Sequence, residues 1–440
     1  MSPLEQLLAG VLPDPDGGPP LAVPTAAVAI APSLEGREAD LIAALDLGRR
    51  LAVVSDPTTR AVLGRRVERA LDGIVRVEAV VLPERPHADD ATVARLRRET
   101  AAADALVAVG SGTVNDLCKY VAALDAKPYA VFATAPSMNG YTSVNAAITV
   151  AGHKKSLPAV AARGVFMDLA VLAAAPPRMI RSGLGDSLCR PTAQADWLLA
   201  HLLLGRPYRT APFALLAEDE AALFAEPAAL LAGDLEAMAR LARTLVLSGF
   251  GMTLCGGSFP ASQGEHLIGH YLDMMAPALP EAFHGEQIGV TTLVMARLYE
   301  RLLDGGPPRP AATAVTREDV VQHFGPALGE SCWAEFAQKR LDPAGAEALG
   351  AELAARWNEI RDALSRVLRP AGELEAVLRA AGAPTRGAEL GWPAALTAAA
   401  VLHARAIRNR YTALDLAGDS GLLPAFARDE AAAEEARHDV

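Results

Sequence analysis

The sequence predicts an α/β protein with an N-terminal Rossmann-like parallel-sheet domain followed by an all-helical domain. Two observations lead to this fold class. Up to about residue 175, short apolar runs alternate with amphipathic stretches, which is typical of a parallel sheet covered by helices. After Pro176 and Pro177 the spacing of apolar residues is helical almost to the end. We therefore expect a nucleotide-type α/β domain over residues 1–175 and a helical domain over 176–440, with a ligand cleft between them.

The spacing of apolar residues predicts the strands and helices of each domain. Buried strands are expected at residues 27–30, 51–55, 78–82, 105–109 and 129–134. Helices are expected between them at residues 37–49, 58–72 and 89–103. The second domain is expected to hold helices at residues 185–205, 217–249, 262–276, 284–304, 345–383 and 393–416. The Gly305-Gly-Pro-Pro stretch and Pro370 mark breaks between helices.

Composition narrows the class of partner. The formal net charge of −11 argues against nucleic acid or an acidic membrane surface, although a small anion needs only a few local donors. No apolar run reaches the roughly 18–20 residues that span a bilayer, and the N-terminus lacks the pattern of a secretory signal. The four cysteines are widely scattered, which suits neither a disulfide framework nor a thiolate zinc knuckle. We therefore expect a cytoplasmic protein without a membrane span.

A glycine-containing turn follows the fourth expected strand and opens a helix. In Gly110-Ser-Gly-Thr-Val114, two glycines let the backbone approach a pyrophosphate, whose charge the helix N-terminus favours. Asn115 occupies the place of the third glycine of the usual dinucleotide fingerprint. An ordinary strand-to-helix turn, with Thr113 as N-cap and Asp116 completing a capping box, is equally compatible with the sequence.

Two further polar segments follow expected strands. Asp56 comes after the second strand, where a carboxylate can accept hydrogen bonds from an adenosine ribose and thereby favour NAD. A plain N-cap before Pro57 is at least as compatible with the sequence. The segment from Thr134 to Asn145 is rich in hydroxyls and amides, and loops at this edge of a parallel sheet bind ligands. The sequence thus predicts a ligand site along one edge of the sheet.

Three histidines lie close together in the helical half. Glu265-His266-Leu-Ile-Gly-His270 places two imidazoles on one face of a helix, and His284 begins the next helix. Asp186, in Gly183-Leu-Gly-Asp-Ser, is expected at a helix start. Two neutral imidazoles and a carboxylate suit a divalent metal with an open position for substrate. Histidines satisfied within the core are the alternative interpretation.

Together these motifs resemble the sn-glycerol-1-phosphate dehydrogenase family. The family belongs to the dehydroquinate synthase-like superfamily, with iron-type alcohol dehydrogenases and glycerol dehydrogenases. The resemblance runs from about Leu51 to Leu303 and depends most on the segments 134–143, 185–197, 262–266 and 284–287, with a last piece at 408–415. Four such segments in the same order are unlike a chance match.

Position by position, the resemblance implies that Asp186, His266 and His284 ligate the metal. His270 and Asp186 would be catalytic and, with Asn139, would contact the substrate. The residues implied to contact the dinucleotide are Asp56, Gly110, Ser111, Gly112, Thr113, Val114, Thr134, Ala135, Pro136, Ser137 and Ser143. Many relatives carry an aspartate where Asn139 stands, and this difference bears on the choice of substrate. The cofactors would be NAD or NADP and one divalent metal, for which two histidines and a carboxylate favour zinc or nickel.

The activity that the resemblance implies is reversible hydride transfer between a nicotinamide and dihydroxyacetone phosphate, giving sn-glycerol 1-phosphate, in phospholipid metabolism. Basic candidates for its phosphate are Lys154, Lys155 and Arg410. Three alternatives stay open: a dehydrogenase of an unphosphorylated polyol such as glycerol, a dehydroquinate-synthase-like enzyme, and a non-catalytic metal- or nucleotide-binding member of the superfamily. The expected partner is a small phosphorylated polyol or ketone, and apolar helix faces suggest a homodimer.

Overall fold

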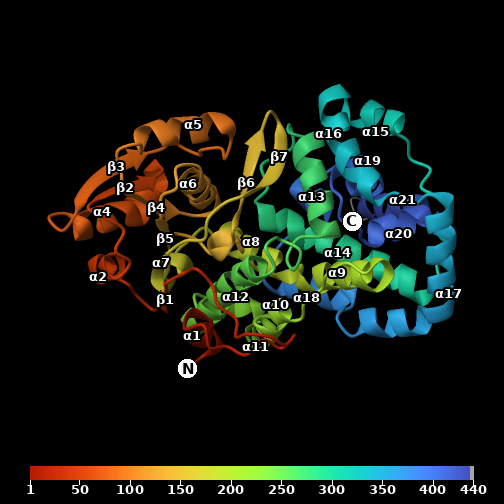
Figure 1. Ribbon diagram of the computed structural model, residues 1–440, viewed down its shortest axis with the longest axis horizontal. Helices are drawn as coiled ribbons and strands as arrows, with labels where there is room; N and C mark the ends of the chain where they lie inside the picture. Colours follow the sequence, from red (N-terminus) through yellow and green to blue (C-terminus); the bar gives the residue numbers. More distant parts are fainter. Residues whose placement is uncertain (437–440) are drawn as a thin grey trace. The chain divides into compact units, whose positions relative to one another are not determined.

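The computed structural model describes residues 1–436, whose contacts group into two compact units (Figure 1). The first unit holds Met1–Ser187 and Arg209–Ser258, and the second holds Leu188–Tyr208 and the chain from Phe259 onward. This grouping differs from the expected boundary at residue 175, because helices between residues 209 and 258 pack with the sheet. Within residues 1–436, none of the helices combines the length and the apolar character that crossing a bilayer requires.

The first unit is built on a six-stranded parallel sheet in the order β1-β8-β5-β4-β2-β3 (Figure 1). Its strands are β1 (Ala27–Ala31), β2 (Arg50–Ser55), β3 (Arg76–Val81), β4 (Ala105–Gly110), β5 (Tyr129–Ala133) and β8 (Gly164–Asp168). The first five are the predicted strands. The sequence prediction missed β8 and an antiparallel hairpin of β6 (Asn145–Val150) and β7 (His153–Pro158).

The order of the strands reverses between β2 and β4. The chain passes outward from β2 to β3 and then returns to the other side of β2. In parallel sheets a ligand binds where the order reverses, beyond the carboxyl ends of the strands. Asp56 follows β2 and Ser111 follows β4, so the predicted nucleotide loops flank this position.

Helices cover both faces of the sheet. On one face, side chains of α2 and α4 pack against alternate strand residues, including Val53, Val107 and Phe132. The helix α6 packs against β4 and lies beside α5 (Figure 1). The helices of the first unit are α1 (Pro3–Leu8), α2 (Glu38–Ala43), α3 (Pro57–Thr59), α4 (Arg65–Leu71), α5 (Asp90–Glu99), α6 (Gly112–Leu124), α7 (Leu169–Ala173), α8 (Pro177–Leu188), α10 (Ala211–Ala214), α11 (Ala217–Ala225) and α12 (Leu235–Leu254).

Prolines divide two of the helices that were expected to be continuous. The range 185–205 falls on the end of α8 and on α9 (Arg190–Leu204), which has Pro191 in its first turn. Because proline lacks an N–H, it starts a helix more readily than it continues one. Asp186 therefore lies in the last turn of α8, and its predicted place at a helix start is wrong. Pro227 likewise separates α11 from α12.

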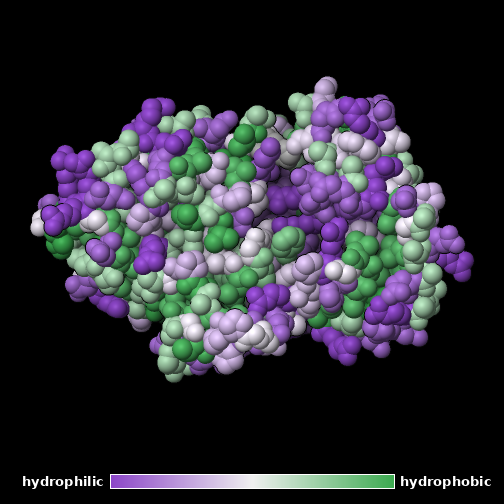
Figure 2. All heavy atoms as spheres, in the orientation of Figure 1, coloured by the Kyte–Doolittle hydropathy of each residue, from purple (hydrophilic) through white to green (hydrophobic). Residues whose placement is uncertain are grey.

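The second unit is helical, as predicted. Its helices are α9, α13 (Gly264–Met275), α14 (His284–Asp304), α15 (Arg317–Phe324), α16 (Pro326–Phe336), α17 (Pro343–Ser365), α18 (Ala371–Ala380), α19 (Ala394–His403), α20 (Ala413–Asp419) and α21 (Leu423–Glu435). One apolar core joins all of these helices except α18, with Leu267 and Tyr271 of α13 packed among residues such as Leu298, Leu353 and Val401. Figure 2 shows hydrophilic residues gathered over the outer helices α5 and α15, which therefore turn polar faces to solvent.

Candidate functional site

The start of α6 has no side-chain cap among the described residues. Ser111 is the N-cap in extended conformation. The alternative with Thr113 as N-cap and Asp116 in a capping box is therefore wrong. The Asp116 carboxylate instead accepts from the backbone N of Ala147 at 3.0 Å. A Cβ on Gly110 would come within 2.6 Å of the Val114 Cβ, so the turn needs glycine here.

The two predicted dinucleotide loops of the first unit lie side by side. The backbone N of Thr134 donates to the Gly110 carbonyl at 3.2 Å. A Cβ on Gly112 would stand 3.4 Å from the Met138 side chain, which is ordinary contact. The segments 110–114 and 134–138 therefore lie next to one another beyond β4 and β5.

A buried lysine on α6, which the sequence analysis missed, forms hydrogen bonds with the loop at residues 140–145. Lys119 is fully buried, and its ammonium donates to the carbonyls of Gly140 and Asn145 and to the Ser143 Oγ, the last at 3.0 Å. The carboxylate of Asp116 lies 3.7 Å from the same ammonium. Burial raises the pKa of Asp116 and lowers that of Lys119, and their mutual attraction opposes both shifts. This bridge holds Ser143, a predicted cofactor contact, in place.

Asp56 acts as a helix cap. Its Oδ1 accepts from the Thr59 backbone N at 2.8 Å, and the Thr59 hydroxyl accepts from the Asp56 backbone N at 3.0 Å. Pro57 occupies the first helical position of α3. The N-cap that the sequence analysis kept open is thus present, and a contact between Asp56 and a ribose stays a prediction.

Asn139 and Asp186 are joined within the first unit. The Asp186 Oδ2 accepts from the Asn139 backbone N at 2.7 Å, and both residues are buried. The hydroxyl of Ser182, one turn earlier on α8, donates to the Ser137 carbonyl at 3.0 Å. A Cβ on Gly183 would lie 1.7 Å from the Pro136 carbonyl oxygen, so only glycine lets α8 approach the loop this closely. The loop therefore fixes the orientation of the Asp186 carboxylate.

The other side of the same loop packs on α12. The Thr142 hydroxyl donates to the Val246 carbonyl at 2.6 Å, and the Thr253 hydroxyl donates to the Thr142 carbonyl at 2.8 Å. A Cβ on Gly249 would come within 2.1 Å of the Thr142 Oγ1. Asn139 is thus carried by a loop that is held by hydrogen bonds on two sides.

In the second unit the three predicted histidines converge. The ring centroids of His266 and His284 are 5.1 Å apart, and His270 lies 6.0 Å from each of them. His266 and His270 come from successive turns of α13, and His284 is the first residue of α14. His266 and His270 are buried, whereas His284 is partly exposed. The three imidazoles predicted to lie together thus do so, and their binding of a metal stays a prediction.

Two buried carboxylates that the sequence analysis assigned no role orient the start of α13. The Glu265 Oε1 lies 2.9 Å from the His266 Nδ1 and accepts from the Gln263 backbone N at 2.7 Å. The Asp196 Oδ2 accepts from the Gly264 backbone N at 2.9 Å. Burial raises the pKa of Glu265 to about 7, and burial with the nearby charge of Glu265 raises that of Asp196 to about 7. Glu265 therefore orients the His266 imidazole through its Nδ1.

A second set of possible ligands, Cys189, Glu265 and His266, has donor atoms within 4.8 Å of one another. The Cys189 Sγ lies 3.6 Å from the Ala261 carbonyl. Glu265 is occupied by its bonds to His266 and Gln263, so we assign it to the orientation of His266.

The basic candidates for a phosphate occupy different units. Lys154 and Lys155 lie on the β7 strand of the hairpin in the first unit. Arg410 belongs to the second unit, where its Nη1 donates to the Ser262 carbonyl just before α13. Arg410 thus contacts the segment that leads into His266, a predicted metal ligand.

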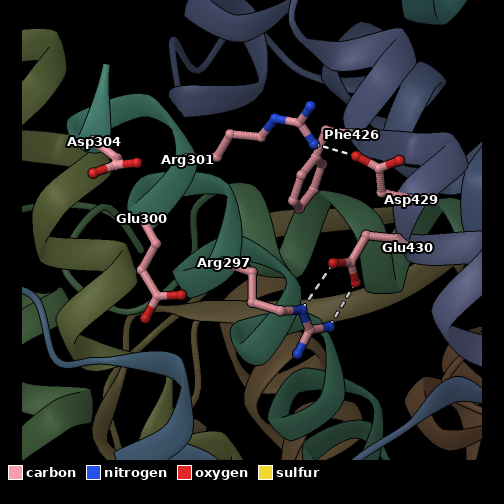
Figure 3. A pocket seen from close by; sticks show the side chains of 7 residues that line it. All are labelled: Arg297, Glu300, Arg301, Asp304, Phe426, Asp429 and Glu430. Carbon is pink, nitrogen blue, oxygen red and sulfur yellow. Dashed lines mark hydrogen bonds and ion pairs between the residues drawn. The ribbon is translucent and has the colours of Figure 1, made fainter.

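A charged groove lies elsewhere in the second unit, between α14 and α21 (Figure 3). Its arginines face carboxylates: Arg297 makes a bidentate bond with Glu430, at 2.8 and 2.6 Å, and Arg301 pairs with Asp429. These charges neutralise one another, so the groove offers no evident ligand site.

Comparison with known proteins places the chain among dehydrogenases. The iron-containing alcohol dehydrogenase family model matches residues 29–176. The NAD(P)+ glycerol-1-phosphate dehydrogenase of Pyrococcus furiosus is 32% identical over 255 residues, covering 58% of this chain and 73% of the relative. That of Bacillus licheniformis is 28% identical over 384 residues, covering 86% and 84%. A probable glycerol dehydrogenase from Sinorhizobium meliloti has the same fold, with a TM-score of 0.60 and 20% identity over 92% of this chain and 97% of that chain.

Proposed function

Since the chain belongs to the glycerol-1-phosphate dehydrogenase family, we propose that it is a metal- and NAD(P)-dependent oxidoreductase that interconverts dihydroxyacetone phosphate and sn-glycerol 1-phosphate. The observation that carries this proposal is the 32% identity to the Pyrococcus furiosus relative of that name. The convergence of His266, His270 and His284 supports it independently, because metal-assisted reduction of a ketone needs such a donor set.

We propose Asp186, His266 and His284 as the metal ligands, with zinc or nickel as the metal. Two neutral imidazoles and one carboxylate are a donor set that both ions accept. The surroundings of each residue fit this role within its own unit. Glu265 orients His266, and the Asn139 backbone N orients Asp186.

The dinucleotide is assigned to the edge of the sheet where the strand order reverses. The free first turn of α6 favours a pyrophosphate, and residues 134–137 with Ser143 line the adjacent loop. Asp56 keeps one carboxylate oxygen in its cap, and the other is the group that would accept from a ribose of NAD. When bound, the nicotinamide supplies the hydride and the divalent cation stabilises the negative charge that develops on the ketone oxygen.

The remaining steps fall to side chains of this chain. His270 lies one helical turn after His266 and is our candidate to give a proton to the substrate oxygen. Asn139 presents an uncharged amide, which can donate to a substrate hydroxyl or accept from it. An aspartate in its place could only accept, so this position is expected to tune substrate preference.

The test is a comparison of substrates. In metal-loaded enzyme we expect oxidation of NADH or NADPH with dihydroxyacetone phosphate, at a kcat/KM at least about tenfold higher than with dihydroxyacetone. Turnover of dihydroxyacetone or glycerol without turnover of the phosphates would favour the unphosphorylated-polyol alternative. Absence of turnover with every ketone, in enzyme that binds metal and nucleotide, would favour the non-catalytic alternative.

The assembly and location of the protein stay predictions. The exposed large apolar side chains include Val11, Val62, Ile74, Leu124 and Phe259, and they are scattered over the chain. A homodimer would have to bury such residues. Sedimentation equilibrium of the full-length protein tests the homodimer, and cell fractionation tests the cytoplasmic location.

A further inference from the structure

We propose that Arg408 and Arg410 form the subsite that binds the phosphate of the substrate, and that this pair sets the preference for a phosphorylated triose. The inference rests on the proposed function, because it names the residues that recognise its phosphomonoester. The two arginines stand on one short segment between α19 and α20, in the second unit alone.

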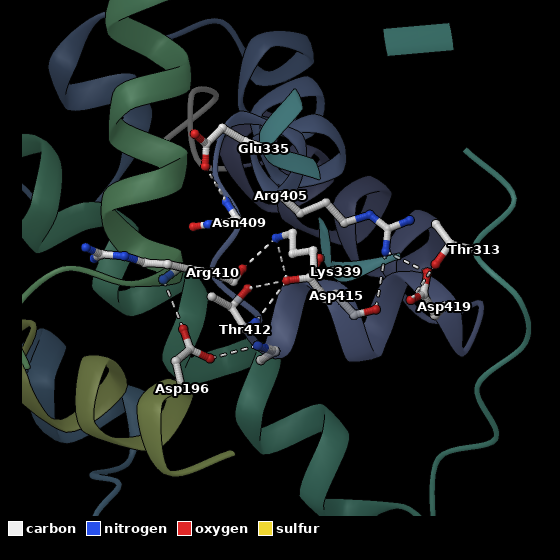
Figure 4. Close-up of polar contacts among 12 residues, drawn as sticks. Asp196, Thr313, Glu335, Lys339, Arg405, Asn409, Arg410, Thr412, Asp415 and Asp419 are labelled. Atoms are coloured by element: carbon white, nitrogen blue, oxygen red, sulfur yellow. Dashed lines mark hydrogen bonds and ion pairs between the residues drawn. The ribbon is translucent and has the colours of Figure 1, made fainter. Parts of the chain in front are cut away.

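The two arginines lie two residues apart, on a segment that bends at residues 408 and 409. Their positive charges act on one another. Asn409, between them, points elsewhere, and its amide donates to the Gln338 Oε1 at 3.0 Å. In Figure 4 the Arg410 side chain reaches away from Lys339 and Asp415. Two guanidinium groups close enough to repel one another can share a single oxyanion.

Buried polar contacts hold the segment rigidly from behind (Figure 4). The Lys339 ammonium donates to the Arg410 carbonyl and to the Asp415 Oδ2, the latter at 2.9 Å. The backbone N of Thr412 donates to the same Asp415 oxygen at 2.9 Å. The backbone N of Ala413 donates to Asp196, the carboxylate that also holds the start of α13, at 2.7 Å. The arginines are therefore presented by a scaffold whose position is coupled to the metal-binding helix.

Arg410 lies against the segment that leads into His266. Its Nη1 donates to the Ser262 carbonyl, and its guanidinium stacks over the Phe259 ring at 4.9 Å from the centroid. Ser262 precedes His266 by four residues, so the cation borders the start of the helix that carries His266 and His270. A triose phosphate is short, and its phosphate must bind close to the groups that act on its carbonyl.

The electrostatic surroundings favour an added anion. The acidic groups that act on Arg408 and Arg410 are Glu335 and Glu265, whose oxygens already accept from backbone or histidine nitrogens.

Burial, and then the repulsion from Arg408, lower the pKa of Arg410 to about 9. A phosphate between the two guanidinium groups would relieve this repulsion and supply charge-assisted hydrogen bonds.

The test uses full-length, metal-loaded protein with Arg408→Gln and Arg410→Gln, and with Arg356→Gln as the matched control. Arg356 is on α17, where it pairs with Glu352 and Glu359 at the surface. We expect each of the first two substitutions to raise the KM for dihydroxyacetone phosphate about ten- to a hundredfold while leaving kcat/KM for dihydroxyacetone within about twofold. The control should leave both unchanged. Arg408→Gln keeps the Arg410–Ser262 bond and serves if Arg410→Gln folds poorly.

A second readout separates this inference from the proposed function. Titration calorimetry with inorganic phosphate should show binding to the wild type that Arg408→Gln weakens at least about tenfold. Phosphate binding that both substitutions leave unchanged overturns the subsite, whatever the enzyme turns over. Equal losses of kcat/KM on both ketones overturn it as well. If phosphate binding needs the arginines but dihydroxyacetone phosphate is not turned over, the subsite stands and the proposed function falls.

Discussion

Two helices that begin beside predicted site residues, α6 and α13, differ in how their N-termini are capped. A helix N-terminus carries about half a positive charge on unsatisfied N–H groups. At α6, in the first unit, no side chain within residues 1–436 caps this charge. At α13, in the second unit, the buried carboxylates of Asp196 and Glu265 already accept from the backbone N of Gly264 and of Gln263.

The difference assigns a different task to each helix. The open end of α6 can receive the negative charge of a ligand, which is why we assign the pyrophosphate there. At the start of α13 the carboxylates of Asp196 and Glu265 already accept from backbone N–H groups, so we assign no ligand anion there. These carboxylates instead orient His266 and fix the helix against α9. The presence of a helix N-terminus is therefore not sufficient to predict an anion site, because its cap decides what it can bind.

Placing a carboxylate cap on the N-terminus of α6 should have the largest effect, which we expect on nucleotide affinity. Ser111→Asp would place a carboxylate at the N-cap of α6, where it would accept from the first turn and repel a pyrophosphate. We expect the Kd for NADH and NADPH to rise about a hundredfold with no loss of thermal stability. Thr316→Asp, which makes the same kind of change at the cap of α15, is the control and should leave the Kd unchanged. A nucleotide affinity unaltered by Ser111→Asp would remove the distinction between the two helices.

Removing the charge of Glu265 at the start of α13 should lower the affinity for metal more than the affinity for nucleotide. In Glu265→Gln the side chain can still accept from His266 but loses its charge, and we expect metal affinity to fall about ten- to a hundredfold. Competition with a chromophoric chelator measures this change, and Glu352→Gln on the surface of α17 is the matched control. If the metal affinity of Glu265→Gln equals that of the wild type, Glu265 does not act on the metal site.

The smallest expected effect concerns the ionisation of Asp196, which should make the free energy of unfolding depend on pH. Its pKa is raised from the ordinary 3.8 to about 7, by burial first and then by the charge of Glu265. The folded chain thus holds a proton here that the unfolded chain has lost, so stability decreases as the pH rises from about 4 to about 7, by at most roughly 1.4 kcal/mol per pH unit. Asp196→Asn should lower the Tm at pH 5 and remove this part of the slope. Equal slopes in variant and wild type between pH 4 and 7 would contradict the assignment.

The sequence predicted the sheet better than the helical boundaries. The strands β1 to β5 were recognisable because residues such as Val53 and Val107, buried on both faces of a sheet, form continuous apolar runs. The hairpin β6–β7 was missed, since Lys154 and Lys155 give it a polar composition, and β8 was missed although all five of its residues are buried. Pro191 was not weighed as the start of a new helix, which misplaced Asp186.

The candidate ligands could be named from the sequence, whereas the residues that contact them could not. Histidines four residues apart on a helix can be read directly from the sequence. The roles of Lys119, Asp196 and Glu265 depend on contacts with residues distant in the chain, such as the 68 positions between Asp196 and Gly264. Buried charges of this kind acquire a function only through their tertiary partners.

The most direct test that metal binding and nucleotide binding belong to different helices is His266→Ala. The control is His201→Ala, at an exposed histidine. Metal content by mass spectrometry and NADH affinity by fluorescence should be measured on the same preparations. We expect His266→Ala to lose stoichiometric metal and ketone reduction while its Kd for NADH stays within about threefold of the wild type. A variant that retains one equivalent of metal, or that loses NADH binding while keeping the metal, would contradict the account.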